Sequence, residues 1–484
     1  MKKNSLTTAV VAGIAGVAGF AGLASAVELN ADGLGQVLIY PYYTVNKNQD
    51  TLLSVVNTTD VGKAVKVRFL EGYNSREVLD FNLFLSPYDV WTARVSTNGA
   101  GAGVSSTDTS CTWPALNGSV PFRAAAYAGG STFPADSGPQ GVDRTREGYV
   151  ELIEMGEIIP GSPLDATTTH AQNGNPNEGE PACGSAIQGT TPGGYLSNPG
   201  GGLFGAGSIV NVGDGTLFAY NADAIDGFSD DVLFSGPSGL TPSLLQANNA
   251  ASAFGGAVAY VFANGSLLTL DYSNGIDAVS AVFLSDAIYN EYLVSGDIGA
   301  NSDWVVTFPT KRFYVDEYYV GATAVQPFVD VFRYAPANDG TSFVEVGINL
   351  FDQEEGFTDQ PDDFSPPIAE QPSSLPYEVN VISFLTETAA EDPSGVLGSN
   401  LRANIVPYGD AGWLKLDLAS GDGGHAMVPA DNNGYVLHGL PATGFYAYNV
   451  INANAAPGKL ANYNGLFRHR ASRVCTDANG AACS

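Results

Sequence analysis

The clearest chemical feature of the sequence is a short acidic segment that could bind a metal ion. Within eleven residues it places five side chains that end in a carboxylate or an amide: Asn221, Asp223, Asp226, Asp230 and Asp231. Calcium is bound in proteins by about six to eight oxygen atoms from such side chains and from backbone carbonyls. The segment therefore predicts a calcium site, with solvated turns as the alternative.

A second acidic segment has a similar composition. Its carboxylates are Asp352, Glu354, Glu355, Asp359, Asp362 and Asp363. Gly356 lies one position early for the loop of an EF-hand, so that class of calcium site is not predicted. A calcium site of another kind and a set of solvated turns are both open interpretations.

Four glutamates offer the carboxylates that glycoside hydrolysis needs, a pair of acidic groups about 5 to 9.5 Å apart. They are Glu147, Glu151, Glu154 and Glu157. The simpler interpretation, which we favour, is that they lie on the solvent face of a strand. The sequence has no Gly-x-Ser-x-Gly elbow, no His-Glu-x-x-His helix and no phosphate-binding glycine motif. No catalytic residue is therefore predicted.

Two groups of side chains suggest surface recognition. Two tyrosine clusters could form flat platforms for sugars, although tyrosine is also common in the packed faces of strands: Tyr40, Tyr42 and Tyr43, and Tyr314, Tyr318 and Tyr319. The one dense basic group is Arg468, His469, Arg470 and Arg473. We expect it to pair with carboxylates of the protein, with contact to anionic glycans or phosphates as the alternative.

The four cysteines predict disulfides, because their number is even and the chain carries a signal for export. Three pairings are possible, and proximity in the sequence favours Cys111 with Cys183 and Cys475 with Cys483. Zinc is disfavoured because the four histidines show no paired spacing with these thiols.

The first 26 residues predict the compartment. Lys2 and Lys3 precede an apolar run from Ala9 to Leu23, which ends in Ala24-Ser25-Ala26, the pattern of a cleavable signal peptide. No later segment is apolar and long enough for a membrane helix. We expect a secreted or cell-surface protein with no transmembrane segment after cleavage.

The charge of the chain restricts its partners. It has 50 acidic and 20 basic residues among 484, a net charge of −30. Because nucleic acids are bound by displacing counterions with Lys and Arg, a nucleic-acid partner is not expected. Other surface proteins, a second copy of the chain, and glycans are the expected partners.

The elements that position these residues are predicted from the alternation of apolar and polar residues with a period of two. Val65, Val67 and Phe69 alternate with Lys66 and Arg68, the pattern of a half-buried strand. A hairpin is expected over residues 257–272, around the Asn264-Gly265 turn. Short helices are expected after Thr241-Pro242 and over Asp277–Leu293. The sequence thus predicts an all-β fold of two Ig-like β-sandwich domains with a loop-rich insertion and a few short helices.

The expected organisation of the chain follows its composition. After the signal peptide 1–26 we place an N-terminal sandwich domain at 27–310 and a C-terminal one at 311–484. The first domain contains a Gly/Pro/Ser-rich insertion at 97–202. Because loops on a rigid scaffold carry recognition more often than strands do, this insertion is the expected contact region.

Four blocks of the sequence carry a resemblance to known proteins: Val37–Tyr43, Thr51–Trp91, Asp303–Arg312 and Gly439–Phe445. The second block resembles the opening of Ig-like sandwiches on bacterial surfaces. Together the blocks resemble a family of uncharacterised exported proteobacterial proteins rich in β-structure. The resemblance covers most of the mature chain and transfers no activity and no site residue.

The expected function is therefore a structural or adhesive one at the cell exterior, through binding or assembly. The alternative is a secreted carbohydrate-active enzyme or carbohydrate-binding protein.

Overall fold

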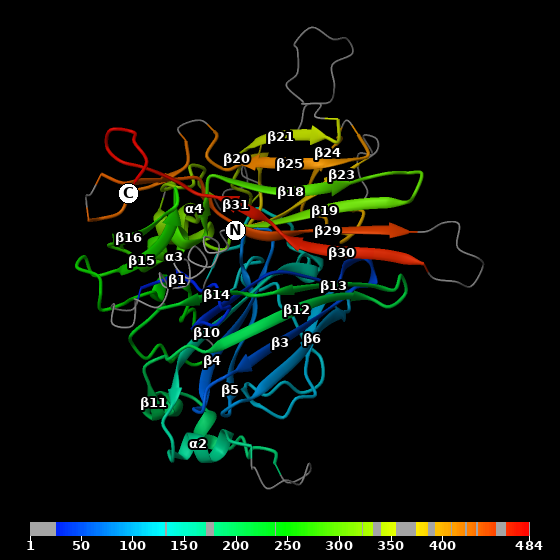
Figure 1. The fold of residues 1–484 in the computed structure, drawn as a ribbon. Helices are drawn as coiled ribbons and strands as arrows, with labels where there is room; N and C mark the ends of the chain where they lie inside the picture. Colours follow the sequence, from blue (N-terminus) through cyan, green and yellow to red (C-terminus); the bar gives the residue numbers. More distant parts are fainter. Residues whose placement is uncertain are drawn as a thin grey trace, which may run out of the picture.

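The computed structural model describes residues 26–130, 133–170, 179–237, 239–321, 323–332, 340–354, 374–385, 393–407, 409–421, 424–431, 434–451 and 461–483. The signal peptide prediction, apart from Ala26, lies outside these residues. Strands dominate and helices are short, which confirms the all-β sandwich class (Figure 1). No helix within the described ranges is long and apolar enough to cross a membrane.

Two antiparallel sheets form the lower part of the molecule in Figure 1. The first sheet contains, in order, β1 (Glu28–Leu29), β14 (Asp223–Asp226), β2 (Val37–Thr44), β10 (Glu147–Ile158), β4 (Lys63–Glu71), β5 (Glu77–Leu85) and β8 (Cys111–Trp113), with β11 (Leu196–Ser197) on β10. The second contains β13 (Thr216–Asn221), β12 (Leu203–Asn211), β3 (Asp50–Asn57), β6 (Val90–Asn98), β7 (Gly101–Ser105) and β9 (Val120–Pro121).

One apolar core joins the facing sides of these two sheets. Strand β6 shows the alternation that produces it, because Trp91, Ala93 and Val95 are buried while Val90, Thr92 and Arg94 are exposed. Strand β4 differs from the expectation of a half-buried strand. Lys66 and Arg68 are as buried as Val67, because the far face of the sheet is also covered.

Two further sheets form the upper part of the molecule in Figure 1. A five-stranded sheet has the order β24 (Arg402–Ile405), β23 (Val379–Phe384), β19 (Ala300–Thr307), β29 (Thr443–Ile451) and β30 (Asn462–Arg468), with β23 and β24 parallel. A four-stranded antiparallel sheet has the order β21 (Gly347–Asp352), β25 (Ala411–Asp417), β18 (Ala287–Leu293) and β31 (Arg470–Ser472).

The five-stranded sheet is buried on both faces. Trp304 and Val306 of β19 belong to one apolar core, with Leu414 and Leu416 of the four-stranded sheet. Val305, from the opposite face of β19, belongs to the core of the lower sandwich. Because both faces are covered, seven of the eight residues of β19 and all six of β23 are buried, polar ones included.

Smaller elements complete the fold. The short sheets are β15 (Ala257–Ala263) with β16 (Ser266–Tyr272), β17 (Leu284–Ser285) with β28 (Leu440–Pro441), β20 (Val344–Glu345) with β22 (Ser374–Leu375), and β26 (Ala426–Met427), β27 (Val436–His438) and β32 (Val474–Thr476). The α-helices are α2 (Pro163–Thr168), α3 (Gly275–Phe283), α4 (Arg312–Val315) and α5 (Glu317–Val320). The 3-10 turns are η1 (Asn46–Asn48), η2 (Val142–Arg146), η3 (Ser185–Ile187), η4 (Thr191–Tyr195) and η5 (Leu244–Gln246).

The local predictions had mixed outcomes. The expected hairpin is confirmed as β15 and β16, and both Asn264 and Gly265 have the positive φ that its turn requires. The helix expected over Asp277–Leu293 is correct only as far as Phe283, because Ile288 and Tyr292 pack inward with the period of a strand. After Pro242 the chain forms the 3-10 turn η5, whose N-cap is Ser243, in place of the expected helix.

Both predicted disulfides are confirmed, Cys111 with Cys183 and Cys475 with Cys483. The first closes a long loop within the predicted insertion, and the second closes the loop after β32. The division of the chain at residue 310 stays a prediction. Strands β18 and β19, which precede it, pair with β25, β31, β23 and β29, which follow it.

Candidate functional site

The five residues of the predicted calcium segment have separate partners. Asp223 is buried and accepts hydrogen bonds from Arg468 and Thr443. Asp226 faces Glu28 across the β1/β14 pair, and burial, followed in Glu28 by the charge of Asp226, raises the pKa of both carboxyls.

The remaining residues of that segment face elsewhere. Asp230 accepts from the backbone N–H of Ala250, Asp231 accepts from the Asn248 amide, and Asn221 is exposed at the end of β13. Among the described residues, no group of three or more His, Cys, Asp or Glu side chains could hold a metal ion. Calcium binding by this segment stays a prediction.

Most of the second acidic segment lies outside the described residues. Asp352 ends β21, and its carboxylate accepts from the backbone N–H of Glu354. The other members, Glu355, Asp359, Asp362 and Asp363, are not among the residues that the structure describes.

The glutamates of β10 form buried ion pairs and hydrogen bonds rather than an exposed row. Glu151 lies between Arg68 and Arg312, at 3.2 and 3.3 Å. Glu154 accepts from Lys63 at 3.0 Å, and burial raises the pKa of its carboxyl to about 7. Glu147 accepts from the Tyr42 hydroxyl at 2.8 Å. The expected solvent-facing position is therefore wrong for these three side chains, and only Glu157 is partly exposed.

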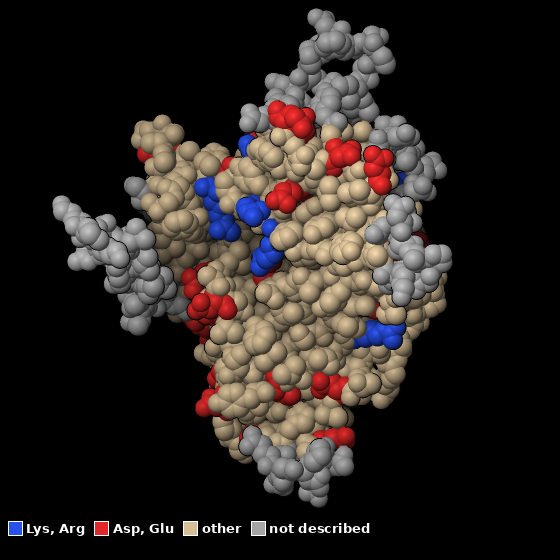
Figure 2. Space-filling view, turned by 45° about the vertical axis from the view of Figure 1, so that its right-hand side comes forward, with Lys and Arg blue, Asp and Glu red and all other residues tan. Residues whose placement is uncertain are grey.

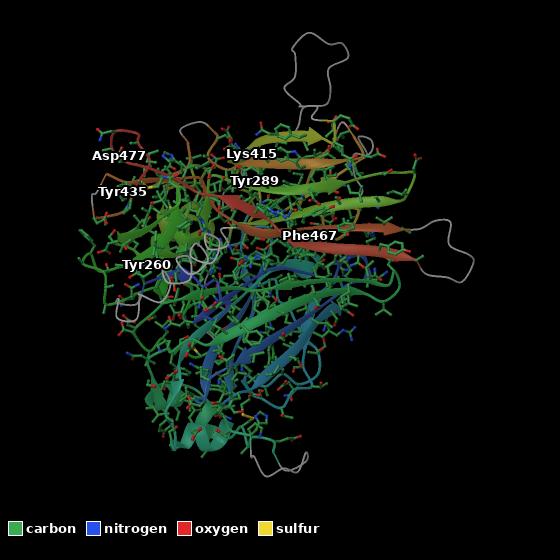
Figure 3. The ribbon with its side chains drawn as sticks, viewed as in Figure 1. Tyr260, Tyr289, Lys415, Tyr435, Phe467 and Asp477 are labelled. Atoms are coloured by element: carbon green, nitrogen blue, oxygen red, sulfur yellow. A yellow bond between two sulfur atoms is a disulfide. The ribbon has the colours of Figure 1, made fainter. Side chains whose placement is uncertain are left out.

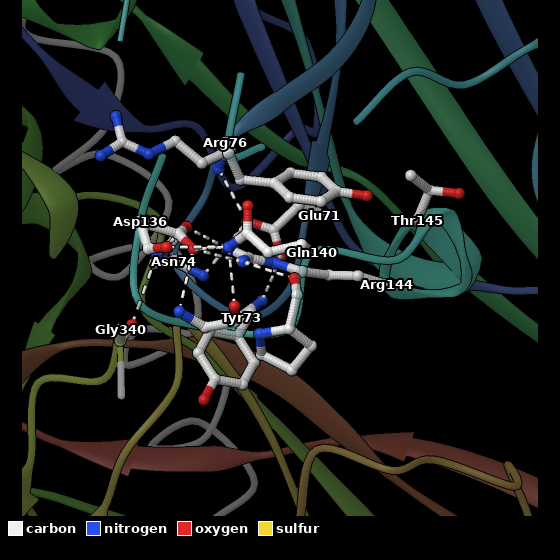
Figure 4. A network of polar contacts seen from close by, with 12 residues as sticks. Glu71, Tyr73, Asn74, Arg76, Asp136, Gln140, Arg144, Thr145 and Gly340 are labelled. Atoms are coloured by element: carbon white, nitrogen blue, oxygen red, sulfur yellow. Dashed lines mark hydrogen bonds and ion pairs between the residues drawn. The ribbon is translucent and has the colours of Figure 1, made fainter. Parts of the chain in front are cut away.

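A further buried network fixes the loop between β9 and β10 against the β4/β5 turn. Arg144 donates to Glu71 at 2.8 Å and to Asp136 at 2.7 Å, and its guanidinium also contacts Asn74 (Figure 4). The rings of Tyr73 and Tyr127 lie 4.6 and 4.3 Å from the same guanidinium. The side chains of both carboxylates are fully buried. The charges of Arg144, Glu71 and Asp136 therefore pair with one another inside the protein and have a structural role.

The predicted tyrosine platforms are mostly interior. Tyr40, Tyr42 and Tyr43 are buried, and each hydroxyl donates to a protein oxygen. Tyr314 is also buried, whereas Tyr318 is 52% exposed. Packing therefore accounts for the first cluster, as the alternative interpretation proposed.

The basic group near the C-terminus is divided between interior and surface. Arg468 pairs with Asp223, as expected for internal pairing. Arg473 donates to the backbone carbonyls of Val282 and Leu284, and His469 packs on Trp304 with its pKa lowered to about 4 by burial. Arg470 is exposed, and no ion pair is observed for its guanidinium in the described part of the chain.

The exposed side chain of Arg470 belongs to an aromatic surface on the four-stranded sheet. Its inner face is apolar, so the alternate residues point outward. In the strand register Tyr289 of β18 lies directly between Lys415 of β25 and Arg470 of β31. One pleat along, Phe351 of β21 lies opposite Trp413 of β25. We call these five residues the aromatic–basic patch.

The rings of the patch form a short platform. Phe351 and Trp413 stack with centroids 4.1 Å apart and planes within 8° of parallel, and Tyr289 lies 6.4 Å from Trp413. Trp413 is 40% exposed. Figure 3 shows Tyr289 and Lys415 on neighbouring strands.

Lys415 of the patch stays positively charged near neutral pH. Burial lowers the pKa of Lys415, but the hydrogen bond and charge of Asp417, at 3.1 Å, outweigh it, so the pKa of Lys415 is raised. Elsewhere seven of the basic side chains are buried: Lys63, Lys66, Arg68, Arg76, Arg144, Lys311 and Arg312. The face in Figure 2 carries one group of neighbouring Lys and Arg side chains, with acidic ones scattered around it. Such a group on an acidic protein is a place where an anion can be held.

Sequence reasoning identified Arg470 and missed the aromatic members of the patch. The alternation of the buried Leu414 and Leu416 with Lys415 is a local signal for the outer face of a strand, but Tyr289 and Phe351 join the patch only through strand pairing. No family model, curated protein or solved structure matches this chain.

Proposed function

We propose that the protein is an adhesive protein of the cell exterior that binds anionic glycans through the aromatic–basic patch. The observation that carries the proposal is the register that puts Tyr289 between Lys415 and Arg470, beside the stacked rings of Phe351 and Trp413. The predicted signal peptide and the two disulfides support an exterior location. The finer description of the sandwiches as Ig-like belongs to the same proposal.

The chemistry of the patch suits acidic sugars. The face of an aromatic ring is apolar and carries partial negative charge, so it contacts the C–H groups on the face of a sugar ring. A guanidinium binds a carboxylate or sulfate through two parallel hydrogen bonds. Lys415 and Arg470 are two strands apart, about 10 Å from the spacing of strands in a sheet. A short run of sugar rings covers this distance.

The patch favours glycans over the other expected partners. A protein partner would be held mainly by a buried apolar centre. In this patch the Tyr289 ring has a cation on each side, whereas Trp413 lies between Phe351 and the exposed Glu291. A neutral glycan would use the rings and leave Arg470 without a partner. An anionic glycan uses both kinds of group.

The proposal is tested by titrating the protein with polygalacturonate and with neutral dextran of similar length, by calorimetry. We expect binding to polygalacturonate, weakening as salt is added, and no binding to dextran. Arg470→Gln should weaken binding several-fold. Arg94→Gln is the matched control, because Arg94 is also an exposed strand arginine, on the six-stranded sheet. Equal binding of both polymers, or equal effects of the two variants, would contradict the proposal.

A further inference from the structure

A second site of different chemistry lies on the lower sandwich. Strand β5 forms one side of an open groove of about 460 Å³. The residues that complete it are Pro114, Ala115, Leu116, Val120, Arg123, Ala125, Ala126, Gly130, Phe133, Pro237 and Leu240. Its apolar lining includes Leu79, Phe81, Leu116, Val120, Phe133 and Leu240. We call it the β5 groove. Its volume lies in the usual range for ligand sites, which are mostly apolar with a few polar groups.

The two carboxylates in the β5 groove are neutralised from beneath. Glu77 pairs with Arg68, at 2.6 Å, and Asp80 pairs with Lys66. Arg68 and Lys66 are buried, so neither cation can turn away to solvent. Burial, and then the charge of Glu77, raises the pKa of Asp80 to about 6, which further weakens the negative charge on this wall.

The remaining charged group in the lining is Arg123. Its backbone N–H donates to the carbonyl of Val78 at 2.9 Å, which fixes it beside β5. The residue is exposed, and within the described ranges no ion pair or side-chain hydrogen bond is observed for its guanidinium. The groove therefore combines an apolar lining, compensated acids and one uncompensated cation.

We propose that the β5 groove binds an apolar carboxylate, with its chain against Leu79 and Leu116 and its carboxylate on Arg123. A guanidinium and a carboxylate form charge-assisted hydrogen bonds, which are stronger than neutral ones. At ~30 Å³ for each non-hydrogen group, the volume that a water molecule occupies in the liquid, the groove holds roughly a dozen to fifteen such groups. A medium-chain fatty acid has this size. The groove is separate from the aromatic–basic patch, and this proposal does not depend on the function proposed for that patch.

The same reasoning predicts that two related ligands bind more weakly than the carboxylate. An alkyl amine would leave Arg123 without a partner and place a second cation beside it. A neutral alcohol of the same length would fill the apolar lining but form only neutral hydrogen bonds, so it should bind about tenfold more weakly, which corresponds to ~1.4 kcal/mol.

The experiment is a calorimetric titration of the full chain with decanoate, decanol and decylamine, each below its micelle-forming concentration. We expect decanoate to bind most tightly, and Arg123→Gln to weaken decanoate about tenfold, to the level of decanol, as loss of ~1.4 kcal/mol would do. Arg94→Gln, the matched surface arginine, should leave decanoate binding unchanged.

Three outcomes would overturn the proposal: no binding of decanoate at millimolar concentration, tighter binding of decylamine than of decanoate, or unchanged decanoate binding in Arg123→Gln. Leu116→Ser tests the apolar wall independently, and it should weaken decanoate and decanol by the same factor. An effect on decanoate alone would contradict the assigned position of the chain.

Discussion

Replacing Arg144 by methionine should destabilise the protein strongly, because its guanidinium forms ion pairs with two carboxylates that have no access to water. The side chains of Glu71 and Asp136 are fully buried, and Arg144 donates to both, at 2.8 and 2.7 Å (Figure 4). Methionine keeps much of the apolar stem and removes the charge. Breaking a buried ion pair from one side costs ~3–5 kcal/mol, and this is the loss expected for Arg144→Met.

The matched control is Arg94→Met. Arg94 also pairs with one carboxylate at a short distance, 2.7 Å to Asp50, but its side chain is 57% exposed. An exposed ion pair contributes ~0–1 kcal/mol, and solvent screening places this one at the lower end. The two variants therefore separate the effect of burial from that of removing an arginine.

The assay is urea unfolding of both variants and the wild type with the disulfides intact, followed by fluorescence and circular dichroism. A typical domain has ~5–15 kcal/mol of stability, so Arg144→Met should still fold while its unfolding midpoint falls clearly. A loss for Arg144→Met within about 0.5 kcal/mol of that for Arg94→Met would refute the reasoning, since ordinary surface substitutions change stability by about that amount.

Two further predictions concern stability. Cys111→Ser with Cys183→Ser opens a loop with a sequence separation of 72 and should cost ~4.4 kcal/mol, whereas Cys475→Ser with Cys483→Ser, separation 8, should cost ~2.6 kcal/mol. Thermal unfolding of the two double variants checks the order, and a larger loss from the short loop would contradict it. Burial raises the pKa of Glu378 to about 7, so the folded state holds a proton that the unfolded chain releases near its ordinary pKa of 4.5. Stability from this group is therefore lost as the pH rises from about 4.5 through about 7, and Glu378→Gln should lose less stability than the wild type between about pH 5 and 7.5 in urea unfolding. Equal pH slopes for the two proteins would exclude this role of Glu378.

The sequence was most informative where one local rule decides the structure. The Asn264-Gly265 turn and the pairing of nearby cysteines needed no knowledge of the rest of the fold, and both predictions are confirmed. It was less informative where a second layer covers a sheet. Lys66, Arg68 and Glu151 alternate with apolar residues as solvent-facing side chains do, yet their common face is buried beneath Arg312 and neighbouring residues.

The candidate sites show the same division. Tyr289 and Trp413 are 124 positions apart in the sequence and meet because β18 and β25 are paired, so no local pattern could join them. Arg123 follows the two-residue strand β9, and its position beside Glu77 and Asp80 comes from the hydrogen bond to Val78, which no local pattern predicts. Clusters that are compact in the sequence, such as the acidic residues from 221 to 231, are instead distributed among different partners by the strands that carry them.

The central claim, that the aromatic–basic patch binds an anionic glycan, is tested most directly by comparing Trp413→Ala with Phe204→Ala in polygalacturonate titrations. Each aromatic side chain is 40% exposed on a sheet face, but Phe204 lies on the six-stranded sheet, outside the patch. Trp413→Ala should weaken binding about 5- to 30-fold, the effect of losing ~1–2 kcal/mol of apolar contact, while Phe204→Ala should leave it unchanged. Unchanged binding in Trp413→Ala, or equal losses in the two variants, would contradict the claim.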